Sequence, residues 1–200
     1  KTPMFVARLE SVLFNPPWNV PTSIAEKELL PRERAHPGYL ARNDFIFVDR
    51  GLQQRPGPLN ALGQLKFDFP SPFGVYLHDT PSRLAFALPA RWRSHGCIRL
   101  EKPRELAAAA LAPQGWTAER IDAAIEAGET TRVALSKTIP LYVVYWTVVV
   151  GDDGQADFRP DTYGWDATLT RALAAAGAGG VKVARADSEC AAAKAPKPVV

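Results

Sequence analysis

The chain has 200 residues, which suits one domain with a small inserted subdomain and is long enough to bury a substantial core. Its composition, 46% hydrophobic and 22% charged, is typical of a soluble globular protein, and no run of 18 apolar residues predicts a membrane span. The net charge of +3 at pH 7 could suit an anionic polymer such as cell wall or nucleic acid, but a solvated surface explains it more simply. We therefore predict no nucleic-acid partner.

The first part of the chain predicts a strand and then one short helix. Apolar positions in residues 4–14 indicate a strand, with a bend near Glu10. Ser23 and Glu26 have the spacing of a capping box, which predicts a helix that begins near Ile24 and stops before Pro31. Less regular elements follow, namely a charged turn, a strand, a second turn and a loop: residues 32–37, 45–48, 49–51 and 53–63.

Residues 15–63 therefore have little sheet pattern and many turn residues. Three prolines between residues 15 and 21 cannot pair into a sheet interior. In a compact domain, a weakly structured segment of this length is usually a functional lid or a binding loop. We interpret residues 15–63 as an inserted lid, with an irregular excursion packed on the sheet as the alternative.

The second part of the chain predicts most of the sheet. Residues 64–69 alternate strictly between apolar and polar side chains, and residues 75–78 form a further strand that ends at His78. Residues 139–150 are the longest β-branched and aromatic run, which predicts a central strand. The other expected elements are a short apolar segment, helices that begin after Pro103 and Thr117, a hairpin and a helix capped by Asp166: residues 83–88, 104–112, 118–127, 151–158 and 166–176.

The fold class follows from this order of elements. About eight strands and four short helices are expected, and the helices stay apart from a regular βαβ rhythm. The sequence therefore predicts a mainly β fold, a largely antiparallel β-sandwich with a few short helices at its edge. Residues 177–200 form a low-complexity tail, which we expect to be disordered.

Two of the three histidines and one of the two cysteines fall between residues 78 and 100. Cys97 ends the tetrapeptide Ser-His-Gly-Cys, and a thiol is a good nucleophile only when nearby cations or imidazoles favour its thiolate form. His78, His95 and Arg99 could supply such groups. Gly96 removes the side chain beside the nucleophile, so that a substrate carbonyl and backbone donors could approach closely.

Other functions of Cys97 fit its neighbours less well. Cysteine is often a small buried hydrophobe, but the polar residues on both sides of Cys97 are poor company in a core. A zinc site of His78, His95 and Cys97 would lack paired ligands and a fourth ligand, so we predict no metal and no other cofactor. A disulfide with Cys190 would block the thiol, so we interpret both cysteines as free.

The motif resembles that of the L,D-transpeptidase catalytic domain (YkuD type). In that family a histidine opens a short polar turn, and Ser/Thr-His-Gly-Cys follows after a short gap, with a basic or amide residue two positions further on. The resemblance covers roughly residues 4–173 and extends to the large periplasmic subgroup, which has a capping subdomain. The segments that carry it, besides the motif, are residues 15–21, 37–40, 65–67, 75–81 and 139–140.

The resemblance implies a YkuD-type β-sandwich, with residues 15–63 as the capping subdomain over the active site. It implies Cys97 as nucleophile, His78 as general base, and the backbone carbonyl of Asp79 as the acceptor that orients the base. The Asp79 side chain is expected to form the turn. The donor would be a peptidoglycan tetrapeptide stem that loses D-alanine after its third residue, commonly meso-diaminopimelate. An amine of a neighbouring stem would resolve the thioester to a 3→3 cross-link, and carbapenems would be covalent inhibitors.

Further residues are expected to shape the site. Backbone N–H groups near Gly96 would stabilise the oxyanion. Arg99 could hold a substrate carboxylate or the loop itself, and Tyr76 shares a strand face with His78. For the aromatic candidates, core packing is the alternative. The predicted substrate contacts are Ser94, His95, Arg99, Tyr76 and Trp18.

No signal peptide is visible, because the chain opens at Lys1-Thr-Pro without an apolar leader. The resemblance implies that an export signal or membrane anchor, and the start of the domain, precede this segment. We therefore expect a periplasmic protein of the bacterial cell envelope, with a role in cell-wall organisation and cell shape, whose membrane link lies outside this chain. The sequence predicts neither the oligomeric state nor further partner proteins.

Three other functions stay open at this point. With water as acceptor, the enzyme would be an L,D-carboxypeptidase. A non-catalytic cell-wall-binding module could keep the fold, although part of the reactive set should then be lost. A papain-like cysteine peptidase would place its nucleophile well upstream of its histidine, whereas here the histidine comes first.

Overall fold

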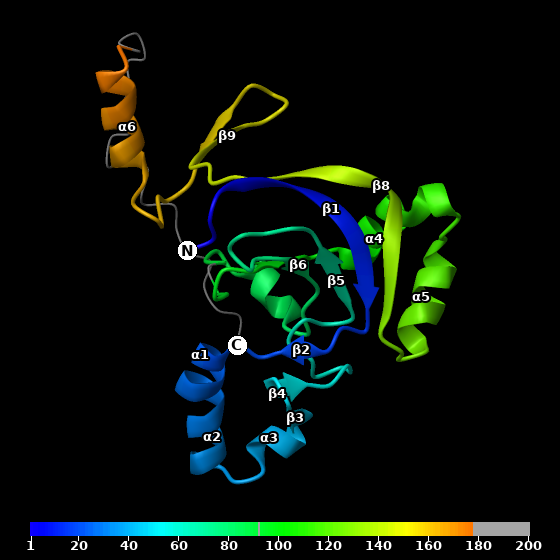
Figure 1. The fold of residues 1–200 in the computed structure, drawn as a ribbon. Coiled ribbons are helices and arrows are strands. Elements are labelled where there is room, and N and C mark those ends of the chain that lie inside the picture. The colour runs from blue at the N-terminus through cyan, green and yellow to red at the C-terminus, as the bar shows by residue number, and fades with distance from the viewer. Residues whose placement is uncertain (92, 178–200) are drawn as a thin grey trace, which may run out of the picture. The chain divides into compact units, whose positions relative to one another are not determined.

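The computed structural model describes residues 1–91 and 93–177. Residues 1–145 form one compact unit, and the described residues from Trp146 onward belong to a second (Figure 1). The mainly β fold class is confirmed, since strands form the central sheet and the helices are short. Apart from Gly177, the predicted tail with Cys190 lies outside the described residues.

The first unit is built on a five-stranded sheet. Its strands are β1 (Phe5–Phe14), β5 (Leu65–Asp68), β6 (Leu77–His78), β7 (Ile98–Arg99) and β8 (Thr131–Val143). They lie in the order β7-β6-β5-β1-β8; β6 and β7 are parallel, and the other neighbours are antiparallel. The pairing of β1 with β8 shifts register between Leu9 and Ser11, which confirms the irregularity predicted near Glu10.

Side chains of the strands alternate between the two faces of this sheet. One face packs against helices α4 (Pro103–Leu111) and α5 (Ala118–Glu126), which lie beside β8 in Figure 1. Both helices begin where the sequence predicts, with Pro103 in the first turn of α4 and Thr117 accepting the N–H of Arg120. The buried side chains at this junction include Val12, Phe14, Leu65, Phe67, Leu111 and Ile121. The opposite face of β5, β6 and β7 is thereby free to carry polar side chains.

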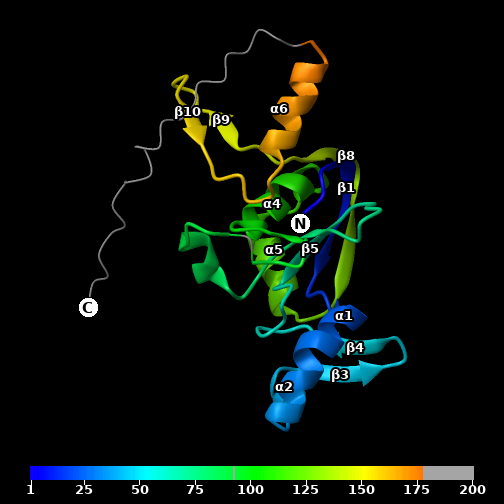
Figure 2. The same cartoon turned by 90° about the vertical axis from the view of Figure 1, so that its left-hand side faces the viewer.

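The insert, which we define as residues 15–63 between β1 and β5, has its own small sheet and hydrophobic cluster. Its elements are β2 (Trp18–Asn19), α1 (Thr22–Ile24), η1 (Ala25–Leu29), α2 (Leu30–Ala35), α3 (Tyr39–Arg42), β3 (Phe45–Val48) and β4 (Gly51–Gln54). The strands lie in the order β2-β4-β3. The cluster contains Val20, Ile24, Leu29, Leu40, Phe45 and Leu52. In Figure 2 the insert extends beyond one end of the central sheet. That it caps a site stays a prediction.

Several local predictions within the insert are wrong. The helix does not stop before Pro31, and residues 32–35 continue it rather than form a turn. The π-helical turn η1 shifts the hydrogen-bond register, and Pro31 falls in the first turn of α2, where a missing N–H costs little. No capping box forms, since Pro21 precedes α1 without a side-chain cap. β4 spans the end of the predicted turn and the start of the predicted loop, and it forms a strand because it pairs with β2 and β3, a tertiary contact.

The run 139–150 is not one central strand. β8 begins earlier, lies at the edge of the sheet and ends at Val143, and Val148–Val150 form β9 of the second unit. β-branched and aromatic residues favour strands without distinguishing centre from edge. The strand order, in which β8 follows β1 at the end of the sheet, identifies it as an edge strand.

The second unit contains the predicted hairpin and the predicted last helix. β9 pairs with β10 (Ala156–Phe158), and α6 (Asp166–Ala175) follows. Asp166 does not cap α6, because its carboxylate accepts the Thr147 hydroxyl at 2.9 Å and Trp165 holds the cap position. Two 3-10 helices of the first unit complete the element list: η2 (Arg83–Ala87) and η3 (Ala112–Gln114).

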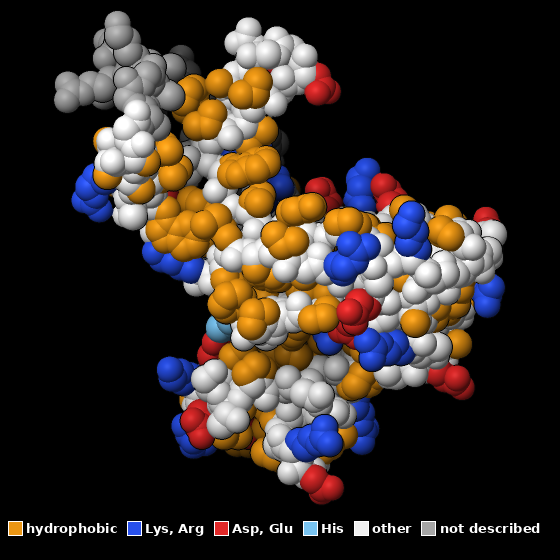
Figure 3. Space-filling model, turned by 45° about the horizontal axis from the view of Figure 1, so that its top comes forward, with side chains coloured by type: hydrophobic (Ala, Val, Ile, Leu, Met, Phe, Trp, Pro, Cys, Tyr) orange, Lys and Arg blue, Asp and Glu red, His pale blue; other side chains and the backbone are white. Residues whose placement is uncertain are grey.

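Charges on the surface are mixed in sign. In Figure 3 the Lys and Arg side chains are interspersed with Asp and Glu, and no single sign dominates the face shown. This distribution fits a solvated surface better than a track for an anionic polymer. None of the helices in the described part of the chain is long and apolar enough to cross a membrane.

Candidate active site

Residues from three neighbouring strands meet on the polar face of the central sheet. Lys66 on β5 lies opposite His78 on β6, and His78 lies opposite Arg99 on β7. Side chains of paired residues point to the same face, so these three form a row with the histidine in the middle. Tyr76 and Cys97 each precede a member of this row by two residues, and the Ile98 N–H donates to the Tyr76 carbonyl at 3.0 Å, so alternation places both side chains on the same face as the row. The sheet therefore presents His78 diagonally across from Cys97.

His78 is held in one orientation. Its ring is buried, and its Nδ1 contacts the carbonyl oxygen of Asp79. Since Nδ1 donates this hydrogen bond, Nε2 is left as the acceptor. Burial lowers the pKa of His78, and the Arg99 guanidinium lowers it as well, against the opposing effect of the Asp79 carbonyl. A neutral imidazole is the form that a general base requires.

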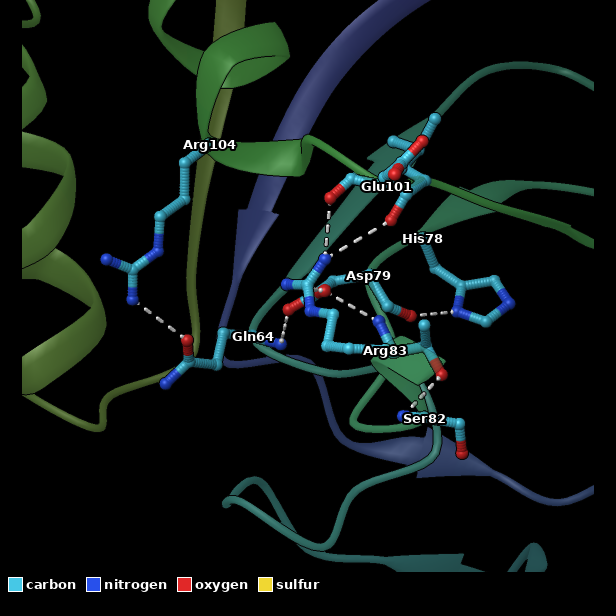
Figure 4. Close-up of polar contacts among 9 residues, drawn as sticks. Gln64, His78, Asp79, Ser82, Arg83, Glu101 and Arg104 are labelled. Carbon is cyan, nitrogen blue, oxygen red and sulfur yellow. Dashed lines mark hydrogen bonds and ion pairs between the residues drawn. The ribbon is translucent and has the colours of Figure 1, made fainter. Parts of the chain in front are cut away.

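The Asp79 carboxylate organises the turn that follows His78. It is buried and accepts the backbone N–H of Thr80 at 2.6 Å and of Gln64 at 2.9 Å. Arg83 forms an ion pair with it at 2.5 Å (Figure 4). Gly63 adopts a positive φ of 64°, and a Cβ built there would lie 2.6 Å from the Cβ of Asp79. The carboxylate is thus a turn-forming group, as expected from the sequence, and it has a cationic partner that the sequence analysis missed.

The loop before β7 is organised by Ser94. Its hydroxyl donates to the carbonyl of Cys97 at 2.6 Å and accepts the N–H of Gly96 at 3.2 Å. The Gly96 carbonyl accepts the Thr2 hydroxyl at 2.9 Å. Gly96 has a φ of 132°, which favours glycine, although nothing lies nearer than 3.9 Å to a Cβ built there. Glycine is therefore needed here for backbone conformation more than for space.

Tyr76 joins the insert to the candidate nucleophile. Its hydroxyl lies near enough to the Cys97 thiol and to the Trp18 indole of β2 for both groups to act on its pKa. Its ring packs edge-on against His78, with centroids 5.8 Å apart, and lies under the Lys66 ammonium at 4.6 Å. Burial raises the pKa of Tyr76, and the neighbouring Cys97 raises it further. The two predicted aromatic contacts, Tyr76 and Trp18, are thus brought together beside the sulfur.

Arg99 is the least satisfied polar side chain of the site. Its Nε is buried, and no hydrogen-bond partner for it is found within the described part of the chain. A buried donor without a partner is costly, and an anion would satisfy it. The unpartnered Nε and the position of Arg99 beside His78 favour a role in substrate binding over a role in holding the loop. The sequence alone favoured neither role.

His95 contacts the insert. Its exposed ring contacts the Glu28 carboxylate of η1 at 2.6 Å. It therefore connects the nucleophile loop to the insert, a contact that the sequence analysis missed. Glu28 and His95 lie 67 positions apart, and the residues around each of them do not predict such a pairing.

Sequence reasoning also missed Lys66 and Arg83. Lys66 was assigned only to the polar face of its strand, and its half-buried ammonium pairs with Asp68 at 2.7 Å. The i,i+4 spacing of Asp79 and Arg83 was the available signal for that ion pair. Among the described residues, no group of three or more His, Cys, Asp and Glu is placed to hold a metal ion.

Two comparisons with known proteins bear on this arrangement. Residues 1–135 match the family model described as the YkuD L,D-transpeptidase catalytic domain. The chain is also similar to a protein of Haemophilus influenzae named "Putative L,D-transpeptidase", at 31% identity over 192 residues and 86% of this chain. The chain spans 39% of the length of that relative.

Proposed function

Because the chain belongs to the YkuD family of L,D-transpeptidase catalytic domains, we propose that it forms 3→3 cross-links in peptidoglycan through a cysteine thioester. Membership of this family implies that the protein is a transpeptidase that acts on peptidoglycan. The observation that supports the finer mechanism is the pairing of His78 with Arg99, from which side-chain alternation would bring Cys97 to the face of a neutral, oriented His78.

In the first step, Nε2 of His78 takes the thiol proton of Cys97. The sulfur attacks the carbonyl of the donor stem's third residue, the bond to D-alanine breaks, and the proton passes to the departing amine. In the second step, an amine of a neighbouring stem attacks the thioester and gives its proton to His78, which returns it to the sulfur. No group beyond this chain and the two stems is required.

The oxyanion would be held by backbone N–H groups near Gly96 and Cys97. The Gly96 N–H donates to Ser94 at 3.2 Å, which is a long bond and therefore a weak competitor for a negatively charged oxygen. The loss of one such donor commonly slows acyl transfer by about a hundredfold or more. Ser94 would thus orient the Gly96 N–H in the resting enzyme and release it when the tetrahedral intermediate forms.

Arg99 would bind a carboxylate of the donor stem. Its unpartnered buried Nε and its place beside His78 support this role. Tyr76 and Trp18 would line the groove next to the sulfur. His95 would act on substrate binding through the insert, which would cover the bound stem. Carbapenems would acylate Cys97 in place of the stem, and the reaction would take place on the periplasmic wall.

The test is a comparison of Cys97→Ala with Cys190→Ala in the full chain. The first variant should lose both D-alanine release from tetrapeptide stems and the mass increase caused by a carbapenem, whereas the second should keep both. Folding is checked by circular dichroism. Turnover by Cys97→Ala would overturn the proposal. Products made only of shortened, unlinked stems would show a carboxypeptidase, and wall binding without turnover a non-catalytic module.

A further inference from the structure

We propose that Arg83 is a positioning residue of this site: its guanidinium ties the turn that orients the base to the strand that follows the nucleophile. The inference rests on the proposed function, since it assigns Arg83 a part in holding His78 and Cys97 in register. Arg83 is the first residue of η2, and it is itself exposed by about half.

One end of the connection is the Asp79 carboxylate. Arg83 Nη2 lies 2.5 Å from Oδ1 of Asp79, and the backbone carbonyl of this same residue accepts the Nδ1–H of His78. The carboxylate is buried against Gly63, which leaves it little freedom to move. The carboxylate that binds Arg83 and the carbonyl that accepts the His78 N–H belong to the same residue, Asp79. A cation bound to this carboxylate therefore influences the orientation of the His78 imidazole.

The other end is the backbone that leaves β7. Arg83 Nη1 donates to the carbonyl of Glu101 at 2.8 Å and approaches that of Leu100 at 3.5 Å (Figure 4). Leu100 is three residues beyond Cys97, and its N–H donates to the carbonyl of His78 at 2.8 Å. The planar guanidinium can hold both ends at once, which an ammonium cannot.

The charge of Arg83 has a second consequence for His78. The charged and titratable groups that face the histidine are Asp79, Arg99, Lys66, Tyr76 and Cys97. Arg83 offsets the negative charge of Asp79. Without it, the carboxylate would favour the imidazolium more strongly, so the pKa of His78 would rise. Removal of the Asp79 charge would have the opposite effect and lower the pKa.

The test combines three variants with a matched control. Arg83→Gln removes both the positive charge and the planar guanidinium. Arg83→Lys keeps the charge without the guanidinium, and Asp79→Asn removes the negative charge of the partner. The control is Arg159→Gln, since Arg159 forms an exposed ion pair with Asp157 at 3.2 Å in the second unit. Two measurements are made on each: kcat and KM for D-alanine release from tetrapeptide stems as a function of pH, and the histidine titration and tautomer by NMR.

We expect Arg83→Gln to lower kcat by about 10- to 100-fold with little change in KM, since misplacement of reacting groups costs this much. Its acid limb and the His78 titration should move to higher pH, whereas those of Asp79→Asn should move to lower pH. Arg83→Lys should keep the wild-type titration and lose part of kcat. Arg159→Gln should match the wild type in both measurements.

The inference is overturned if Arg83→Gln keeps the wild-type kcat, or if Arg83→Gln and Asp79→Asn move the His78 titration in the same direction. If Arg83→Gln does not fold, Arg83→Lys decides by the same two measurements: a full kcat then overturns the proposal. A wild-type protein that carbapenems do not acylate would refute the proposed function. The NMR titration would still test the tie between Arg83, Asp79 and His78.

Discussion

The turn that follows His78 and the loop that precedes Cys97 are held in different ways. Contacts to the turn converge on the buried Asp79, and they come from Gln64, from Leu65 of β5 and from Arg83 of η2. Contacts to the loop are fewer and more exposed, and they come from the N-terminal segment and from the insert. The base is therefore fixed by the central sheet, whereas the nucleophile depends on parts of the chain that lie outside it.

The largest effect should come from a substitution that breaks the turn. Gly63→Ala puts a Cβ against Asp79 at a left-handed φ of 64°, and strain and overpacking should together lower the free energy of unfolding by about 3 kcal/mol. Gly115→Ala is the matched control, because it has a similar φ of 73° with nothing within 4 Å. We expect it to cost only about 1 kcal/mol. Chemical denaturation measures both, and equal losses would show that Asp79 does not fill the space beside Gly63.

A smaller and more local effect is expected in the loop. Gly96→Ala introduces backbone strain, because Gly96 has a φ of 132°, but the new Cβ meets no close neighbour. The loop backbone can therefore relax, and the position of the catalytic groups in the loop changes as a result. Carbapenem acylation should slow by about tenfold, the equivalent of roughly 1.4 kcal/mol, with the unfolding midpoint almost unchanged. Gly57→Ala, at a φ of 148° in the insert and without close neighbours, is the control and should react normally. A large loss of stability in Gly96→Ala would contradict the idea that the loop is only loosely tied.

The same contrast explains what the sequence could and could not predict. Alternation within residues 64–69 and 75–78 is local, so it correctly placed Tyr76 and His78 on one face. The parallel pairing of β6 with β7, and the pairing of Glu28 with His95, join distant segments and have no local signal. The role of the Asp79 carbonyl came from the family resemblance and not from the residues.

Errors in the fold have the same origin. Pro31 marked the end of a helix on local grounds, but the π-helical turn η1 carries the helix past it. The apolar run 139–150 was rich enough for a central strand, yet β8 lies at the edge and ends at Val143. In both cases the local residue preferences favoured the predicted element, but tertiary contacts determined a different structure.

The smallest effect should come from the contact between the loop and the insert. Glu28→Gln removes the carboxylate charge that contacts His95; the two side chains are 40% and 63% exposed, and exposed pairs are worth about 1 kcal/mol or less. Acylation by a carbapenem should therefore slow by less than about fivefold, and the deficit should shrink as salt is added. Glu26→Gln, on the same turn of η1 and also exposed, is the matched control and should react like the wild type.

A double-mutant cycle separates this contact from other effects of either substitution. If the pair acts as a unit, Glu28→Gln should add nothing to His95→Gln, because the second partner has already been removed. Additive losses would mean that His95 acts on the thiol or the substrate directly and that Glu28 only accompanies it. The nucleophile loop would then be independent of the insert, and the difference between a base fixed by the sheet and a nucleophile tied to the insert would no longer hold.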